Sequence, residues 1–141
     1  MQYELTTPCT AADLAPLKAG DTVLLSGVVY TARDQAHRRM LEALDKDEKL
    51  PFDLEGSAIY YVGPTPERPG EVIGSAGPTT SGRMDAMSPR LLDLGNKIMI
   101  GKGKRDAAVK EAVVRNGAVY LAALGGAGAL MAQSVKTLEV I

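Results

Sequence analysis

Residues 74–85, which read GSAGPTTSGRMD, gather the residue types that bind and transform small anions. Three glycines allow the backbone to approach a ligand closely, and Pro78 fixes the backbone angle at the entrance of the stretch. The Thr-Thr-Ser run at 79–81 consists of N-capping residue types, and a helix N-terminus attracts anions. Arg83 adds a planar guanidinium suited to a carboxylate or a phosphate. The stretch predicts an oxyanion site, although its composition also fits an ordinary loop with an exposed arginine.

Two further cationic residues, Arg33 and Lys102, each lie just after the end of a predicted strand. In α/β proteins, ligands bind beyond the carboxyl ends of the strands. Together with Arg83 they would suit a small dianion, because guanidinium groups bind carboxylates with two hydrogen bonds and lysine supplies a point charge. Each has an ordinary alternative: Arg33 as an ion-pair partner of Asp34 or Glu4, and Lys102 as a solvated turn lysine.

Apolar periodicity and turn residues predict the elements that position these groups. We expect strands at 3–6, 21–31, 57–62, 72–76, 97–100, 118–121 and 135–141, and helices at 11–17, 33–47, 89–95, 105–116 and 127–133. Gly27 predicts either a bulge or a break into two strands, and Thr10 or Asp13 is expected to cap the first helix. The alternation predicts an α/β domain with a mixed sheet flanked by helices, with antiparallel pairs early and βα units later.

Composition narrows the class of protein. The 141 residues are 45% hydrophobic and 23% charged, with a net charge of -1, which is typical of one globular domain. The charge balance argues against nucleic acid and membrane surfaces as partners. With no apolar run long enough to span a bilayer and no signal-peptide pattern, we expect a cytoplasmic protein. Cys9 is the single cysteine, so it cannot form an internal disulfide or hold a metal cluster by itself.

Three other features carry weaker signals. The GKGK turn at 101–104 lacks the spacing of a phosphate-binding P-loop, and the GGAG stretch at 125–128 lacks the acidic residue of a dinucleotide fingerprint. His37, on the predicted helix at 33–47, fits either a packing or surface position or a hydrogen-bond donor near the pocket.

Five segments occur in an order that resembles a known family. They are TARD with AH (31–34 and 36–37), IYYVGP (59–64), GSAGPTTSGRMD (74–85), IGKG (100–103) and GGA (125–127). The set is similar to the β subunit, or C-terminal domain, of the iron–sulfur class I fumarases and the related L-tartrate dehydratases. The resemblance extends from about residue 2 to residue 141.

The resemblance implies a swivelling β/β/α domain over residues 1–141 and the reversible removal of water from a 2-hydroxy dicarboxylate. The GRMD block at 82–85 favours malate and fumarate, with tartrate as the alternative. It further implies five substrate-binding residues and one catalytic residue: Arg33, Arg83, Lys102, Gly77 and Thr80 bind the substrate, and Thr79 removes the C3 proton.

The same resemblance implies a four-iron four-sulfur cluster on three cysteines of a partner α subunit, in an α2β2 assembly. Family β subunits usually continue beyond the position of Ile141, so we expect a domain shortened at its C-terminal end. A non-catalytic alternative is a module that kept the anion pocket and lost its partner.

Overall fold

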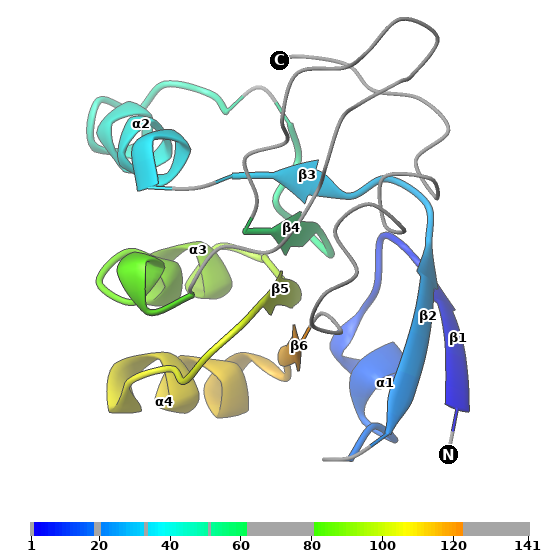
Figure 1. Ribbon diagram of the computed structural model, residues 1–141. Coiled ribbons are helices and arrows are strands. Elements are labelled where there is room, and N and C mark those ends of the chain that lie inside the picture. Colours follow the sequence, from blue (N-terminus) through cyan, green and yellow to red (C-terminus); the bar gives the residue numbers. More distant parts are fainter. Residues whose placement is uncertain (1, 19–20, 33, 51, 62–80, 123–141) are drawn as a thin grey trace, which may run out of the picture.

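A computed structural model describes residues 2–18, 21–32, 34–50, 52–61 and 81–122. Its centre is a four-stranded sheet of β3 (Tyr30–Thr31), β4 (Ala58–Tyr60), β5 (Ile98–Gly101) and β6 (Val119–Ala122). Three helices lie side by side on one face of this sheet: α2 (Asp34–Asp45), α3 (Ser88–Asp93) and α4 (Ala107–Asn116) (Figure 1). On the other face lie α1 (Ala11–Leu14) and a two-stranded sheet of β1 (Gln2–Thr6) and β2 (Thr22–Ser26).

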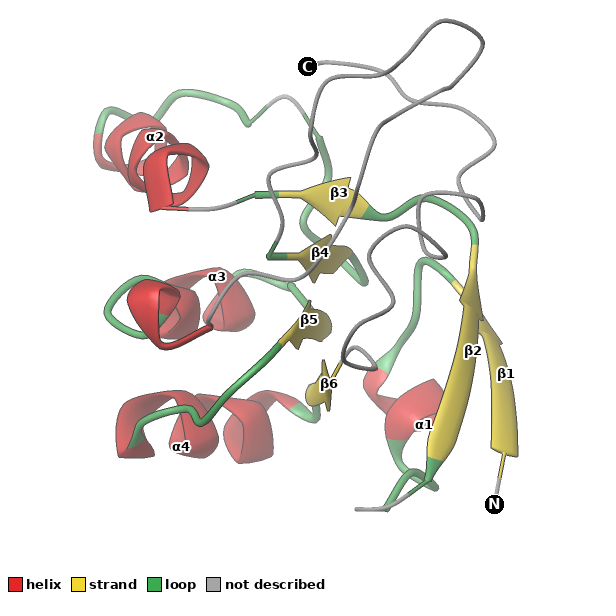
Figure 2. Cartoon of the chain, in the orientation of Figure 1, coloured by secondary structure: helices red, strands yellow, loops and turns green. Residues whose placement is uncertain are grey.

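The order of the larger sheet explains why its three helices share a face. The strands are neighbours in chain order, β3-β4-β5-β6, and every pair is parallel. Parallel strands need a crossover connection, and such crossovers almost always have the same hand. Crossovers of one hand between successive neighbours therefore stack α2, α3 and α4 in a single layer (Figure 2).

The central strand β4 is buried on both faces, and its side chains alternate between two apolar clusters. Ala58 pairs with Ile98, and both pack against α1 and the two-stranded sheet. Ile59 pairs with Met99, and both pack against the helical layer. Because successive strand residues point to opposite faces, one strand joins the two halves of the core.

Capping residues set the ends of α1 and α4, and the caps of α1 are the ones that the sequence predicted. Thr10 and Asp13 form a reciprocal capping box on α1. The carboxylate of Asp106 accepts a hydrogen bond from Val109 N at 3.0 Å and starts α4. Gly117 ends α4 in the left-handed region, with φ of 62°. Local residue types were enough to place these ends.

One expectation about the early strands is confirmed, and another needs correction. Residues 21–31 form two strands, β2 and β3, which is one of the two alternatives that Gly27 predicted, although their membership of different sheets was not predicted. The break falls at Gly27, where φ is 99° and an added Cβ would lie 2.6 Å from Oγ1 of Thr7. The expected antiparallel pairing is wrong for the described strands, because α1 separates β1 from β2 and lets them pair in parallel.

The remaining predicted elements agree with the structure to within a few residues where it describes them. One element after the polar loop was not predicted: Ser81 opens a short 3-10 helix, η1 (Ser81–Met84). The helix predicted at 89–95 is α3, which begins at Ser88 with Pro89 in its first turn. The predicted strands at 72–76 and 135–141 and the helix at 127–133 lie outside the described residues.

Candidate functional site

The carboxyl ends of β3, β4 and β5 form one edge of the larger sheet, because these strands are parallel neighbours. The hydrogen-bond ladder continues one residue past the strand ends. The N–H of Ala32 donates to Tyr60 O at 3.1 Å, and the N–H of Tyr61 donates to Ile100 O at 2.8 Å. Lys102 follows β5 at this edge and is exposed. This is the edge at which open α/β sheets bind ligands.

Ser81, the first residue of η1, packs against the same edge. Its N–H donates to the carbonyl of Lys102 at 2.9 Å, and its side chain is fully buried. The approach is close enough that a Cβ on Gly101 would collide with Oγ of Ser81 and lie 2.9 Å from the ring of Tyr61. Gly101 is therefore required by packing and gives the end of the polar loop its place beside β5.

The predicted site residues fall into two groups. The structure describes the side chain of Lys102, and it describes the backbone of Arg83 within η1. Arg33, Gly77, Thr79 and Thr80 lie outside the described residues. The structure brings η1 to the carbonyl of Lys102, and the convergence of the other groups stays a prediction.

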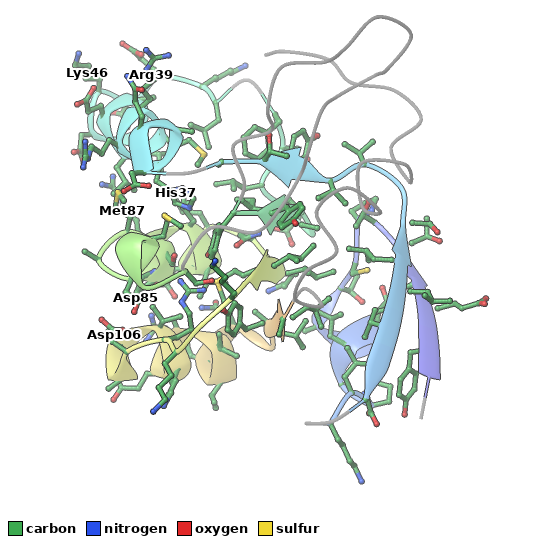
Figure 3. All side chains as sticks on the ribbon, in the orientation of Figure 1. His37, Arg39, Lys46, Asp85, Met87 and Asp106 are labelled. Carbon is green, nitrogen blue, oxygen red and sulfur yellow. The ribbon has the colours of Figure 1, made fainter. Side chains whose placement is uncertain are left out.

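A buried guanidinium that the sequence analysis did not single out lies beside η1. Arg105 is 7% exposed, and its Nε donates to Oδ1 of Asp85 at 2.6 Å. Its other nitrogens donate to Oγ of Ser88 at 2.8 Å and to the hydroxyl of Tyr61 at 3.3 Å. The second oxygen of Asp85 accepts the N–H of Asp106 at 3.0 Å. Figure 3 shows Asp85 and Asp106 near the starts of α3 and α4.

Two tyrosine rings enclose the guanidinium. Its central carbon lies 5.1 Å from the ring centroid of Tyr61 and 5.0 Å from that of Tyr120, both within range of a cation–π attraction. The hydroxyl of Tyr120 donates to Gly103 O at 2.9 Å and lies 2.7 Å from Oγ of Ser81. Since a phenol has one proton, Ser81 is the donor to Tyr120. Tyr120 thus links the buried cation to the edge that carries Lys102.

Burial and neighbouring charges shift the pKa values of Tyr61 and Arg105 in opposite directions. Burial raises the pKa of Tyr61, although the neighbouring Arg105 opposes that rise. For Arg105, burial acts to lower the pKa, but the interactions with Tyr61 and Asp85 outweigh it and raise the pKa. Arg105 is therefore a permanent cation, and Tyr61 is a neutral phenol at physiological pH.

Few features of the sequence indicate this cluster. Asp85 is the last residue of the polar stretch at 74–85, and Arg105 is the first residue of the helix predicted at 105–116. Arginine is seldom fully buried unless it is paired, so its position in the sequence does not indicate burial. The partners of Arg105 come from positions as far away as Tyr61, 44 residues earlier in the chain. The single usable clue was an arginine directly before the N-capping Asp106.

His37 and Cys9, the other reactive side chains, both pack in the interior. His37 is 1% exposed, and its ring edge contacts Tyr61 with centroids 5.4 Å apart. This agrees with a packing position and contradicts a surface position (Figure 3). The thiol of Cys9 is buried and donates to Thr6 O at 3.4 Å, and its pKa is raised by burial and then by Asp13. Burial and this hydrogen bond make Cys9 a structural residue.

The described part of the chain contains no group of three or more His, Cys, Asp and Glu side chains that could hold a metal ion. Nor does it contain a helix long and apolar enough to cross a membrane. A hollow of about 450 Å³ is lined by Leu44 of α2, by residues between α2 and β4, and by Leu94. Those residues precede β4 and β5, so this hollow lies at the end of the sheet opposite the predicted anion site.

A protein-family model and several known proteins are similar to this chain over most or all of its length. A family model described as Fumarase C-terminus covers residues 1–141. A protein of Methanocaldococcus jannaschii named "Putative L(+)-tartrate dehydratase subunit beta" is 44% identical over 133 residues, which are 92% of this chain and 68% of that protein. The L(+)-tartrate dehydratase subunit beta of Escherichia coli is 33% identical over all of this chain and 70% of its own length.

A longer relative contains a similar sequence as part of a larger protein. The aerobic class I fumarate hydratase of Escherichia coli is 38% identical over 132 residues, which are 92% of this chain but 24% of that enzyme. The chain thus spans about two thirds of the separate β subunits and about a quarter of the fumarase. With a match over its full length and relatives above 30% identity, the chain belongs to the fumarase C-terminus family.

Proposed function

We propose that the chain is the β subunit of a two-subunit hydro-lyase that interconverts malate and fumarate by reversible dehydration. The family assignment and the relatives named as dehydratases and hydratases support the type of reaction. The observation that carries the proposal is the hydrogen bond from Ser81 N–H to the carbonyl of Lys102. It joins the end of the predicted anion loop to the carboxyl end of β5, where ligands of α/β sheets bind.

In this proposal the two carboxylates of the substrate are bound by Arg33, Arg83 and Lys102, with Gly77 and Thr80 completing the binding surface. Arginine offers each carboxylate two parallel hydrogen bonds, and lysine adds a mobile positive charge. Thr79 removes the proton from C3. Because a threonine hydroxyl is a weak base, the proton must pass to a second group, which we assign to the partner subunit.

The residues of this chain do not fit the four-iron four-sulfur cluster that the family resemblance implies. Such clusters are held by several cysteine thiolates, and the sequence has one cysteine, the buried Cys9. We therefore propose that a cluster-bearing α subunit binds the cluster and pairs with this chain, in an α2β2 assembly located in the cytoplasm. The swivelling β/β/α type of the domain belongs to the same proposal.

Tartrate is the second candidate substrate. The identity to a relative named as a tartrate dehydratase β subunit is 44%, against 38% for the class I fumarate hydratase. The tartrate relatives are also separate subunits, of which the chain covers 68% and 70%. These figures favour tartrate, whereas the GRMD block at 82–85 favours malate and fumarate.

Anaerobic co-expression with a candidate α subunit, followed by assays on malate, fumarate and tartrate, tests the proposal. We expect the isolated chain to be colourless and inactive, and the complex to turn over malate and fumarate. Turnover of tartrate alone would select the second candidate. If the complex binds dicarboxylates without turnover, the chain is a non-catalytic anion-binding module.

The role of Thr79 is tested by comparing two neighbouring variants in the active complex. Thr79→Ala should lower kcat about a hundredfold or more, the scale of losing a general base, while KM changes little because the three cations remain. Thr80→Ala should act mainly on KM and by much less. A mild Thr79→Ala beside a strongly impaired Thr80→Ala would show that the roles within the pair are reversed.

A further inference from the structure

The short helix η1 is held at both of its ends by groups that lead back to Arg105. At its start, Ser81 donates from its backbone to Lys102 O and from its hydroxyl to Tyr120. Directly after its last residue, Asp85 accepts Nε of Arg105 at 2.6 Å. Arg83 lies between these two attachment points. The position of the Arg83 backbone therefore depends on attachments at both ends of η1, through Ser81, which is buried, and through Asp85, whose side chain is 13% exposed.

Arg105 is placed to act through other residues rather than on a ligand. Its side chain is 3% exposed, and it donates to Asp85, Ser88 and Tyr61 inside the protein. Ser88 in turn donates to the carbonyl of Met84, the last residue of η1, at 3.0 Å. One guanidinium thus supports the end of η1 by two routes, an ion pair and a hydroxyl that bonds its final carbonyl.

Tyr120 connects the same cation to the start of η1. Its ring lies over the guanidinium of Arg105, and its hydroxyl bonds both Ser81 and the carbonyl of Gly103. Gly103 directly follows Lys102, so a single phenol fixes the turn that carries this lysine and the helix that carries Arg83. A phenylalanine here would keep the ring over Arg105 and remove both of these hydrogen bonds.

We infer that Asp85, Arg105 and Tyr120 are positioning residues that fix η1 against the turn at Lys102, and so set the spacing between two of the anion-binding cations. The inference rests on the proposed function, since it concerns the site that would hold the substrate carboxylates. It predicts that these three side chains control substrate affinity and turnover without touching the substrate.

The test measures kcat and KM of the assembled enzyme for Tyr120→Phe and Arg105→Lys, with values normalised to intact complex. We expect kcat/KM to fall by about tenfold to a hundredfold, the scale that a misplacement of about 1 Å produces. A merely structural role would reduce the amount of assembled complex and leave the kcat and KM of that complex unchanged. Unchanged constants for Tyr120→Phe would overturn the inference even if Arg105→Lys fails to fold.

Two matched variants serve as controls. Tyr3 lies in β1, and Tyr3→Phe removes a hydroxyl that donates to Pro16 O at 3.4 Å. Arg115→Lys alters the exposed ion pair with Asp93. Both should leave kcat and KM at wild-type values. A fall in kcat/KM for these controls equal to that of the test variants would overturn the inference, because the effect would then be unspecific.

The failure of the proposed function can be told apart from the failure of this inference. If the wild-type complex turns over no 2-hydroxy dicarboxylate, the proposed function fails, and the dissociation constant of malate is measured by calorimetry instead. Weaker binding of malate by Tyr120→Phe than by Tyr3→Phe would support the positioning role. Equal binding by the two variants, or no binding by the wild-type complex, would overturn it.

Discussion

Two arginine–aspartate pairs join the region of α3 to that of α4, and they differ in almost every property except their chemistry. The pair of Arg105 with Asp85 has N–O distance 2.6 Å and side chains 3% and 13% exposed. The pair of Arg115 with Asp93 has two hydrogen bonds of 2.9 Å, and its side chains are 51% and 46% exposed. The exposed pair has the better bidentate geometry, yet we expect it to contribute less to the stability of the fold.

The difference lies in what replaces the partner when a pair is broken. Water solvates the released charge at the surface, so an exposed pair contributes little to stability. In the interior the released charge stays without solvent, and the remaining hydrogen bonds of Ser88 and Tyr61 are lost with it. The exposed pair lies near the amino end of the sheet and the buried pair near the carboxyl end, beside Lys102.

Arg105→Met should produce the largest effect. It leaves the carboxylate of Asp85, which is 13% exposed, with the N–H of Asp106 as its hydrogen-bond donor among the described residues. Breaking a buried pair from one side costs about 3–5 kcal/mol, and we expect a loss of that size in the free energy of unfolding. Urea unfolding of the purified chain measures it, with Arg115→Met as the matched control. Equal losses in the two variants would erase the contrast between the pairs.

Gly101→Ala should have an intermediate effect and would sharpen the contrast, because it disturbs the buried region without touching a charge. The added methyl group would collide with Oγ of Ser81. Overpacking of this kind typically costs about 1–3 kcal/mol, which urea unfolding can detect. Adding Ser81→Ala to this variant should recover part of the loss. If the double variant is no more stable than Gly101→Ala, the collision is not the cause.

Asp93→Asn should have the smallest effect. The pKa of Asp93 is lowered, first by its hydrogen bonds from Arg115 and then by the one from Asn116. Because the folded pKa lies below the unfolded value, the pair stabilises the fold above the unfolded pKa of about 3.8, and that stabilisation disappears as pH falls through the folded pKa. Thermal unfolding should therefore show a slightly lower Tm for the variant at pH 7 and no difference in strong acid. A difference that persists in strong acid would contradict the assignment.

The parts of the fold that the sequence predicted are those set by neighbouring residues. Thr10 and Asp13 cap α1 as expected, because each acts within a turn of its own position. The helix predicted at 105–116 is α4, although its N-cap, Asp106, was not predicted. The assignment of β2 and β3 to different sheets was not predicted. Gly27 indicated a break, but the break leads into another layer only because residues far along the chain build that layer.

The candidate site divides in the same way. Lys102 was predicted as an anion-binding residue because it follows a strand. Its position at the carboxyl end of β5 agrees with the structure, and its role stays a prediction. Arg105 was missed, because no local pattern distinguishes a buried arginine from a solvated one at the start of a helix. Its burial depends on Asp85, Ser88 and Tyr61, which come from three other segments of the chain. The family resemblance added residue roles that composition and spacing could not supply.

The position of Tyr120 has a consequence for the order in which the chain acquires its structure. Its bond to Ser81 spans 39 residues, and β6 is the last described strand to be synthesised. Until β6 emerges from the ribosome, Arg105 lacks one of its two covering rings and η1 lacks its hydroxyl partner. Closing a loop of this length costs conformational entropy, and that cost comes before the stabilisation that the contact provides. Among the described parts of the chain, we therefore expect the edge that carries Lys102 to be the slowest to order during translation.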